Sequence, residues 1–211
     1  EWLQNQTEAR DKQPFFLYLP LTSPHLPVAP SSAFKGRSKV GLYGDFMLET
    51  DDLVGGVLDA LEKRNTAENT LVLFTSDNGG LWHQWTPREK DDLARYRPTP
   101  RAQYTMQFGH QSNAHLRGTK ADIWEGGHRV PFLVRWPGRT PGGMVSNEPI
   151  ELTDIFATVA EILGEAIPKG GAPDSFSFLS AMKMKARKSP VRPFLIHHSL
   201  RGLFAIRQGE W

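Results

Sequence analysis

Residues 70–80, TLVLFTSDNGG, join a short apolar run to a polar turn. The run at residues 71–74 ends before Asp77, Asn78 and two glycines, a pattern that predicts a strand buried in a parallel sheet. Open α/β sheets bind their ligands just beyond the carboxyl ends of such strands. The side-chain oxygens of Asp77 and Asn78 suit a hard cation such as Ca²⁺ or Mg²⁺. An ordinary Asx turn has the same composition, so both interpretations stay open.

Two further apolar segments, residues 15–19 (FFLYL) and 131–136, predict strands of the same sheet. The first runs into a loop with three prolines that carries His25, and these prolines keep the loop extended. His25 would then lie beyond a strand end, as Asp77 does, and both could face one crevice. A histidine on a plain surface loop is the alternative.

A long helix is predicted over residues 43–64, because apolar residues recur there at helical spacing. Strand, helix and strand would then form a βαβ unit. The acidic residues in the first half of this helix are interpreted as a solvated face rather than as metal ligands, since nothing nearby converges with them: Glu49, Asp51 and Asp52.

The last third of the chain predicts a helix, a connector and a hairpin. Thr153 and Gly164 have the residue types that begin and end a helix over residues 153–163. The basic stretch 182–192 is interpreted as a solvated connector rather than an anion site. Residues 194–211 predict an antiparallel hairpin. We therefore expect an α/β part over residues 1–180, with a connector and the start of a small antiparallel subdomain over 181–211.

Composition narrows the function classes. The chain has 211 residues and a net charge of +2, so its totals do not indicate a nucleic-acid binder. No apolar run is long enough to span a membrane, and the absence of cysteine excludes a thiolate nucleophile in these residues. Residues 81–109, rich in Arg, Trp and Pro, predict either a loop for an anionic or sugar-like substrate or a solvated insertion. Both ends of the chain interrupt a pattern, so we expect a segment of a longer protein.

Several motifs in register resemble the formylglycine-dependent sulfatases. FTSDNGG, LRGTKADIWEGGHRVPFLVRWPG and ELTDIFATVAEILG follow one another in the family's order, and the similarity covers residues 15–164. The resemblance implies the alkaline phosphatase-like fold, a mostly parallel sheet sandwiched by helices. It also implies that these residues are the C-terminal portion of such an enzyme.

The resemblance assigns roles to four residues. Asp77 and Asn78 match ligands of the active-site cation, Ca²⁺ or alternatively Mg²⁺. Lys120 matches the lysine that contacts the sulfate group, and His25 the histidine close to the sulfate and the leaving-group oxygen. Both would be catalytic and substrate-binding. An Asn after the Asp offers oxygen only, whereas phosphatase-like members of the superfamily tend to have a Zn²⁺-binding His there.

The sequence departs from the family by omission. The C/S-x-P-S-R motif that supplies the formylglycine nucleophile is absent from these residues, so we expect it in a preceding N-terminal half and expect this portion alone to be inactive. Alternatives are a phosphodiesterase or phosphonate hydrolase of the same superfamily, or a non-catalytic glycan-binding domain. The expected partner is a sulfate-ester small molecule or a sulfated carbohydrate. The family suggests a periplasmic, extracellular or lysosomal protein, and an uncovered sheet edge would favour self-association.

Overall fold

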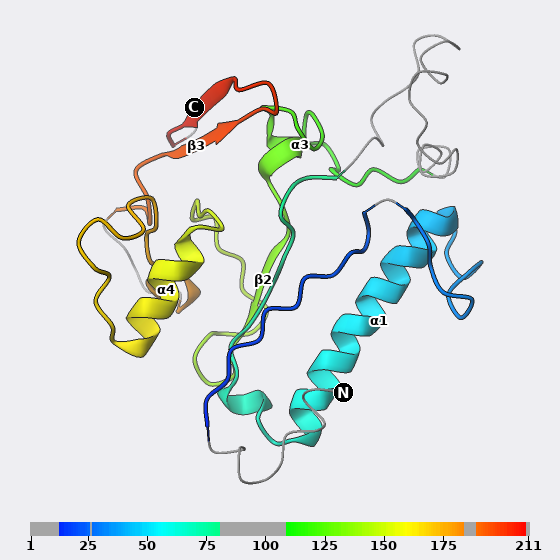
Figure 1. Ribbon diagram of the computed structural model, residues 1–211, viewed down its shortest axis with the longest axis horizontal. Coiled ribbons are helices and arrows are strands. Elements are labelled where there is room, and N and C mark those ends of the chain that lie inside the picture. The colour runs from blue at the N-terminus through cyan, green and yellow to red at the C-terminus, as the bar shows by residue number, and fades with distance from the viewer. Residues whose placement is uncertain (1–12, 26, 81–108, 184–188, 210–211) are drawn as a thin grey trace. The chain divides into compact units, whose positions relative to one another are not determined.

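The computed structural model describes residues 13–25, 27–80, 109–183 and 189–209 (Figure 1). The chain forms two compact units, which are described separately. The first comprises Glu1–Ala67 and Gly80–Thr119, and the second comprises Glu68–Gly79 and Lys120–Trp211. Residues 1–12 and most of the predicted loop at residues 81–109 lie outside the described residues.

The first unit is built on helix α1 (Gly41–Lys63), which confirms the helix predicted over residues 43–64. The chain before α1 is held by Asp45, whose buried carboxylate accepts hydrogen bonds from the backbone N–H groups of Gly36 (2.8 Å) and Ser38 (2.7 Å). Asp51 and Asp52 are exposed, as the solvated-face interpretation predicts.

Residues 15–19 do not form the predicted strand. They run as an irregular segment, and Phe16 and Tyr18 are 80% and 77% exposed. An apolar run becomes a strand only where a neighbouring strand completes a ladder with it, and its sequence does not reveal whether that neighbour is present. The βαβ unit expected from this segment is therefore not formed within the described residues.

The second unit begins with the 3₁₀ turn η2 (Ala67–Asn69, which spans the unit boundary) and strand β1 (Val72–Thr75). Strand β2 (Phe132–Arg135) pairs with β1 in antiparallel register, from Val72 opposite Arg135 to Thr75 opposite Phe132. The two predicted strands are thus confirmed in position. The mostly parallel sheet is not shown here, because both ladders among the described residues are antiparallel.

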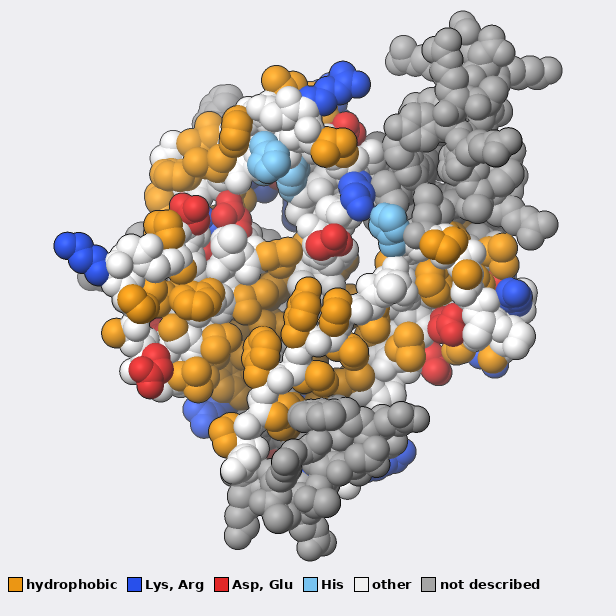
Figure 2. Space-filling view, viewed as in Figure 1, with side chains coloured by type: hydrophobic (Ala, Val, Ile, Leu, Met, Phe, Trp, Pro, Cys, Tyr) orange, Lys and Arg blue, Asp and Glu red, His pale blue; other side chains and the backbone are white. Residues whose placement is uncertain are grey.

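The β1–β2 pair is also less buried than a strand inside a parallel sheet. Phe74 and Leu133, which lie opposite each other, are both exposed, Leu133 by 57%. Hydrophobic side chains reach the surface widely in the space-filling view (Figure 2). The apolar run predicted burial on both faces, whereas one face of this pair is open.

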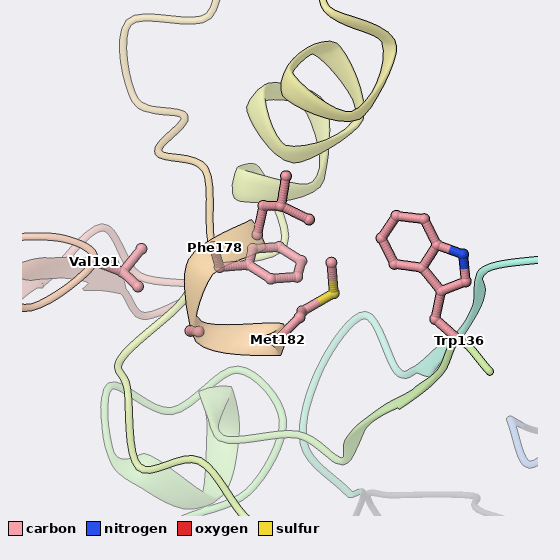
Figure 3. Close-up of a cluster of buried hydrophobic side chains, with 6 residues drawn as sticks. Trp136, Phe178, Met182 and Val191 are labelled. Carbon is pink, nitrogen blue, oxygen red and sulfur yellow. The ribbon is translucent and has the colours of Figure 1, made fainter. Parts of the chain in front are cut away.

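The core of the second unit lies where β2 meets helices α4 (Asp154–Leu163) and α5 (Leu179–Met182). The ring of Phe132 meets that of Phe178 edge to face, with centroids 5.4 Å apart. Burying such aromatic surface is the main favourable contribution to folding here. The buried cluster, shown in Figure 3, comprises Trp136, Phe178, Leu179, Ala181, Met182 and Val191.

Helix α4 has the predicted ends. Thr153 is the residue before its first turn, and Gly164 ends it in the left-handed conformation (φ 73°) that glycine adopts without strain. The Thr153 hydroxyl does not cap the helix. The Asp154 carboxylate instead accepts hydrogen bonds from the N–H groups of Glu151 and Phe176, each at 2.8 Å.

Arg192 is a correction to the solvated connector predicted over residues 182–192. It is only 5% exposed, and its Nη1 lies 3.1 Å from Oδ1 of the fully buried Asp154 and 2.6 Å from Oε2 of Glu151. The charge run gave no sign of this, because the acidic partners lie about forty residues earlier. One buried arginine thus joins α4 to the segment that leads into the C-terminal strands.

That segment continues into strands β3 (Leu195–His198) and β4 (Phe204–Arg207), which pair in antiparallel register. The predicted hairpin is confirmed, with its turn between Ser199 and Gly202. The short helix α3 (Glu125–His128) completes the unit. Among the described residues, none of the helices combines the length and apolar character that crossing a membrane requires.

Replacing Arg192 with Met should destabilise the protein by about 3–5 kcal/mol, because the buried Asp154 carboxylate would lose its charged partner. Urea denaturation of wild type and variant measures this difference. The control is Arg129→Met, which removes a surface pair with Glu125 (Arg129 is 61% exposed) and should cost less than about 1 kcal/mol. Equal losses in the two variants would contradict the importance of the buried pair.

Candidate active site

Asp77 and Asn78 lie on the turn that directly follows β1. Asp77 is exposed and Asn78 is half-buried. The Ser76 hydroxyl donates to the Asn78 carbonyl (3.1 Å), and Nδ2 of Asn78 donates to the Gly79 carbonyl (3.1 Å). The amide nitrogen is therefore used within the turn, and Oδ1, on the other side of Cγ, is the atom of Asn78 suited to a cation.

Gly79 fixes this turn against α3. Its N–H donates to the Gly127 carbonyl at 3.0 Å, and a Cβ at Gly79 would lie 1.8 Å from the Gly126 carbonyl oxygen. No other residue allows such an approach of two main chains. Because α3 begins five residues after Lys120, the second unit brings the Asp77–Asn78 turn against the segment that carries Lys120.

Asn113 is a buried residue of the first unit whose structural role the sequence did not reveal. It is buried, its Oδ1 accepts a hydrogen bond from the Gly80 N–H (2.8 Å), and its Nδ2 donates to the Gly118 carbonyl (3.0 Å). An asparagine within a polar stretch carries no signal of such a bridge, since its partners lie up to 33 residues away.

His25 is exposed on the predicted proline-rich loop of the first unit. Its N–H closes a turn onto the Thr22 carbonyl (3.0 Å), and the neighbouring Ser23 hydroxyl lies 2.7 Å from the buried Thr50 hydroxyl of α1. Helix α1 therefore anchors the loop. The convergence of His25 with Asp77, Asn78 and Lys120 stays a prediction.

His110 also belongs to the first unit, and the sequence assigned it no role. Its Nε2 lies 3.0 Å from the Ser112 hydroxyl, and its ring centroid lies 5.5 Å from that of Tyr43 on α1. Burial lowers the pKa of His110 below its usual value. Burial therefore disfavours the charged form of this imidazole.

The side-chain oxygens of Asp77 and Asn78 are of the type that binds a hard cation. A carboxylate and an amide oxygen are ligands that Ca²⁺ and Mg²⁺ prefer, and Ca²⁺ takes about six to eight of them. Asp77 and Asn78 supply part of such a set. In the described ranges no group of three or more His, Cys, Asp or Glu side chains gathers in a way that could hold a metal ion.

Comparison with known proteins agrees with these motifs. The model of the family described as Sulfatase matches residues 1–165. Human arylsulfatase D is 34% identical over 92% of this chain and 30% of its own length. The mouse steryl-sulfatase is 36% identical over 92% of the chain and 28% of its own length. An N-acetylgalactosamine-6-O-sulfatase of Bacteroides thetaiotaomicron is 32% identical over 95% and 36%. The chain thus spans about a third of the length of these relatives.

Solved structures show the same relationship. One, described under the metabolism of multiple glycosaminoglycans by Bacteroides thetaiotaomicron, matches with a TM-score of 0.82 and 30% identity, covering 96% of this chain and 39% of that one. A Pseudoalteromonas sulfatase matches with a TM-score of 0.70 and 27% identity, covering 90% and 34%. This portion therefore has the fold of the corresponding part of those proteins. Since the family match extends over most of its residues, the chain belongs to the sulfatase family.

Proposed function

We propose that the protein hydrolyses sulfate esters and that these residues supply part of its active site. The observation that carries the proposal is the contact of Gly79 with Gly126 and Gly127, because it joins the Asp-Asn turn to the segment bearing Lys120. These are two of the three motifs that carry the family resemblance. Membership of the sulfatase family supports the same conclusion.

In this proposal Asp77 and Asn78 hold a divalent cation, Ca²⁺ or alternatively Mg²⁺, together with ligands from outside these residues. When bound, the cation stabilises negative charge that grows on the sulfuryl oxygens. The ammonium of Lys120 contacts the same group and stabilises charge that is larger in the transition state than in the substrate. In this arrangement Asp77 and Asn78 bind the cation, and Lys120 binds the sulfate group beside it.

His25 is proposed to donate the proton that the departing alcohol oxygen needs, a contribution on the order of 10²–10⁴-fold. The nucleophile is proposed to be a formylglycine outside these residues. We therefore expect residues 1–211 alone to be inactive, whereas the protein that carries the nucleophile motif hydrolyses the ester.

The exposed face of the β1–β2 pair supports a covering layer in the whole protein. Phe74 and Leu133 offer an apolar face that helices would cover in the expected sheet sandwiched by helices. The substrate is proposed to be an aryl sulfate or a sulfated carbohydrate, the classes named for the relatives. A periplasmic, extracellular or lysosomal location goes with this family.

The protein with its nucleophile motif should hydrolyse an aryl sulfate faster than an aryl phosphodiester in side-by-side assays. Lys120→Met should lower kcat/KM for the sulfate by about 10²-fold or more, because it removes a charge that stabilises the transition state. Lys169→Met, at an exposed position of the second unit, is the control and should leave kcat/KM unchanged. A dominant phosphodiesterase rate would favour the superfamily's other hydrolases, and binding of sulfated glycans without turnover would favour a binding domain.

Removing divalent cations with EGTA should abolish the sulfatase activity, and Ca²⁺ should restore it. Asp77→Asn should raise the Ca²⁺ concentration needed for half-maximal activity at least about tenfold, because one anionic ligand is lost. Metal content measured by mass spectrometry gives a second readout. Asp52→Asn, on the exposed face of α1, should behave as wild type. Full activity of Asp77→Asn without added Ca²⁺ would remove Asp77 from the ligand set.

Gly79→Ala should destabilise the protein by roughly 1–3 kcal/mol and lower its activity, because the added methyl group meets the Gly126 backbone. Thermal denaturation and the aryl sulfate assay measure the two effects. Gly142→Ala introduces its methyl group into open space and should change neither. Wild-type activity in Gly79→Ala would show that this close approach does not set the site.

A further inference from the structure

The β3–β4 hairpin contacts the segment between Lys120 and α3 at separate points (Figure 1). The backbone N–H of Leu200, in the hairpin turn, donates to the Ala121 carbonyl at 3.0 Å. Nη1 of Arg207 on β4 lies 2.7 Å from Oε1 of Glu125 on α3. The first contact involves Ala121, which directly follows Lys120. The second involves Glu125, the first residue of α3, and α3 also accepts the hydrogen bond from Gly79.

The backbone at Ala121 needs such support. Its φ of 78° lies in the left-handed region, which disfavours residues other than glycine. A strained residue persists only where its surroundings impose its conformation. Here the imposed conformation directly follows the lysine proposed to bind sulfate, and the hydrogen bond from Leu200 restrains the same peptide unit.

A pair of histidines forms the third contact. The rings of His128 on α3 and His197 on β3 meet edge to face, with centroids 4.5 Å apart. Nε2 of His128 is buried and has no hydrogen-bond partner among the described residues. Two neutral imidazoles can pack in this way, whereas two imidazolium cations would repel each other and be poorly solvated.

We propose that the β3–β4 hairpin positions Lys120 by clamping residues 120–128, and that protonation of His197 beside His128 releases this clamp. The importance of Lys120 for catalysis rests on the proposed function, whereas the clamp itself rests on the three contacts. Arg207, Glu125 and His197 are thus positioning residues that act through the Lys120 segment rather than on the substrate.

The charges around the pair give the direction of the pH effect. Burial lowers the pKa of His197, and the neighbouring His128 and Arg207 lower it further, while Glu125 opposes them. Glu125 is shared with the exposed Arg129. The released hairpin therefore binds protons more readily than the clamped one. The stability of the clamped state is therefore fully present above the ordinary histidine pKa of about 6.5. It decreases as the pH falls from that value toward the lowered pKa of His197.

Hydrogen exchange of the full-length protein tests the clamp without relying on activity. Protection factors of residues 120–128 should fall between pH 7.5 and 5.5 in wild type, by up to the roughly tenfold that one histidine with a free pKa of about 6.5 allows. His197→Phe keeps an aromatic ring beside His128 but cannot be protonated, so its protection should persist at pH 5.5. His198→Phe is the matched control, because His198 lies on the exposed face of the same strand, and it should follow wild type.

Kinetics test the positioning role. Arg207→Ala should lower kcat for the aryl sulfate at least about tenfold with little change in KM, because misplacing a catalytic group mainly costs rate. Arg207→Lys should recover most of this loss. If His197→Phe and His198→Phe show the same pH dependence of protection, or if Arg207→Ala leaves both kcat and protection unchanged, the proposal is wrong. Normal exchange behaviour without sulfate-ester hydrolysis would support the clamp and refute the proposed function instead.

Discussion

The structure of the second unit depends on the approach of two main chains that only glycine permits. Gly79 gives its N–H to Gly127, and there is no room between Gly79 and Gly126 for even one methyl group. This contact joins the turn after β1 to α3, although more than forty residues separate them in the sequence. The turn with Asp77 and Asn78 cannot shift along the strand axis without breaking this hydrogen bond. The position of the polar side chains is thus set by backbone contact rather than by their own interactions.

A second constraint links this site to the core. Arg192 is buried against Asp154 at the start of α4, and removing either charge would leave the other buried without its partner. The chain leaves Arg192 directly into β3, and the hairpin returns to α3 through Arg207 and Glu125. The hydrophobic cluster around Phe178 therefore supports the site through a short sequence of elements, each held to the next by a polar contact.

Local patterns predicted the elements of this chain well, because their causes are local. The apolar stripe of α1, the Gly164 end of α4 and the hairpin turn all depend on residues a few positions apart. Strand pairing does not. The sequence of residues 71–74 indicates an apolar strand but not the direction of its neighbour, so the antiparallel pairing with β2 was not predicted. Residues 15–19 failed as a strand for the same reason, and Arg192 was misinterpreted because its acidic partners are distant.

The residues of the candidate site also differ in whether the sequence revealed them. Asp77, Asn78 and His25 were identified because each follows a predicted strand, and the family resemblance added Lys120 and assigned an expected role to each of the four. Asn113 and the His128–His197 pair were not, since each acts by holding a backbone segment in place. In the proposed clamp, the segment after Lys120 is held by the left-handed Ala121 and the Leu200 amide, which contribute geometry and no charge. The side chains proposed to bind the cation and the sulfate group act through their charge and their donor atoms. Those that support them are constrained by shape, hydrogen bonding and protonation, which is why their contribution emerges only from the folded structure.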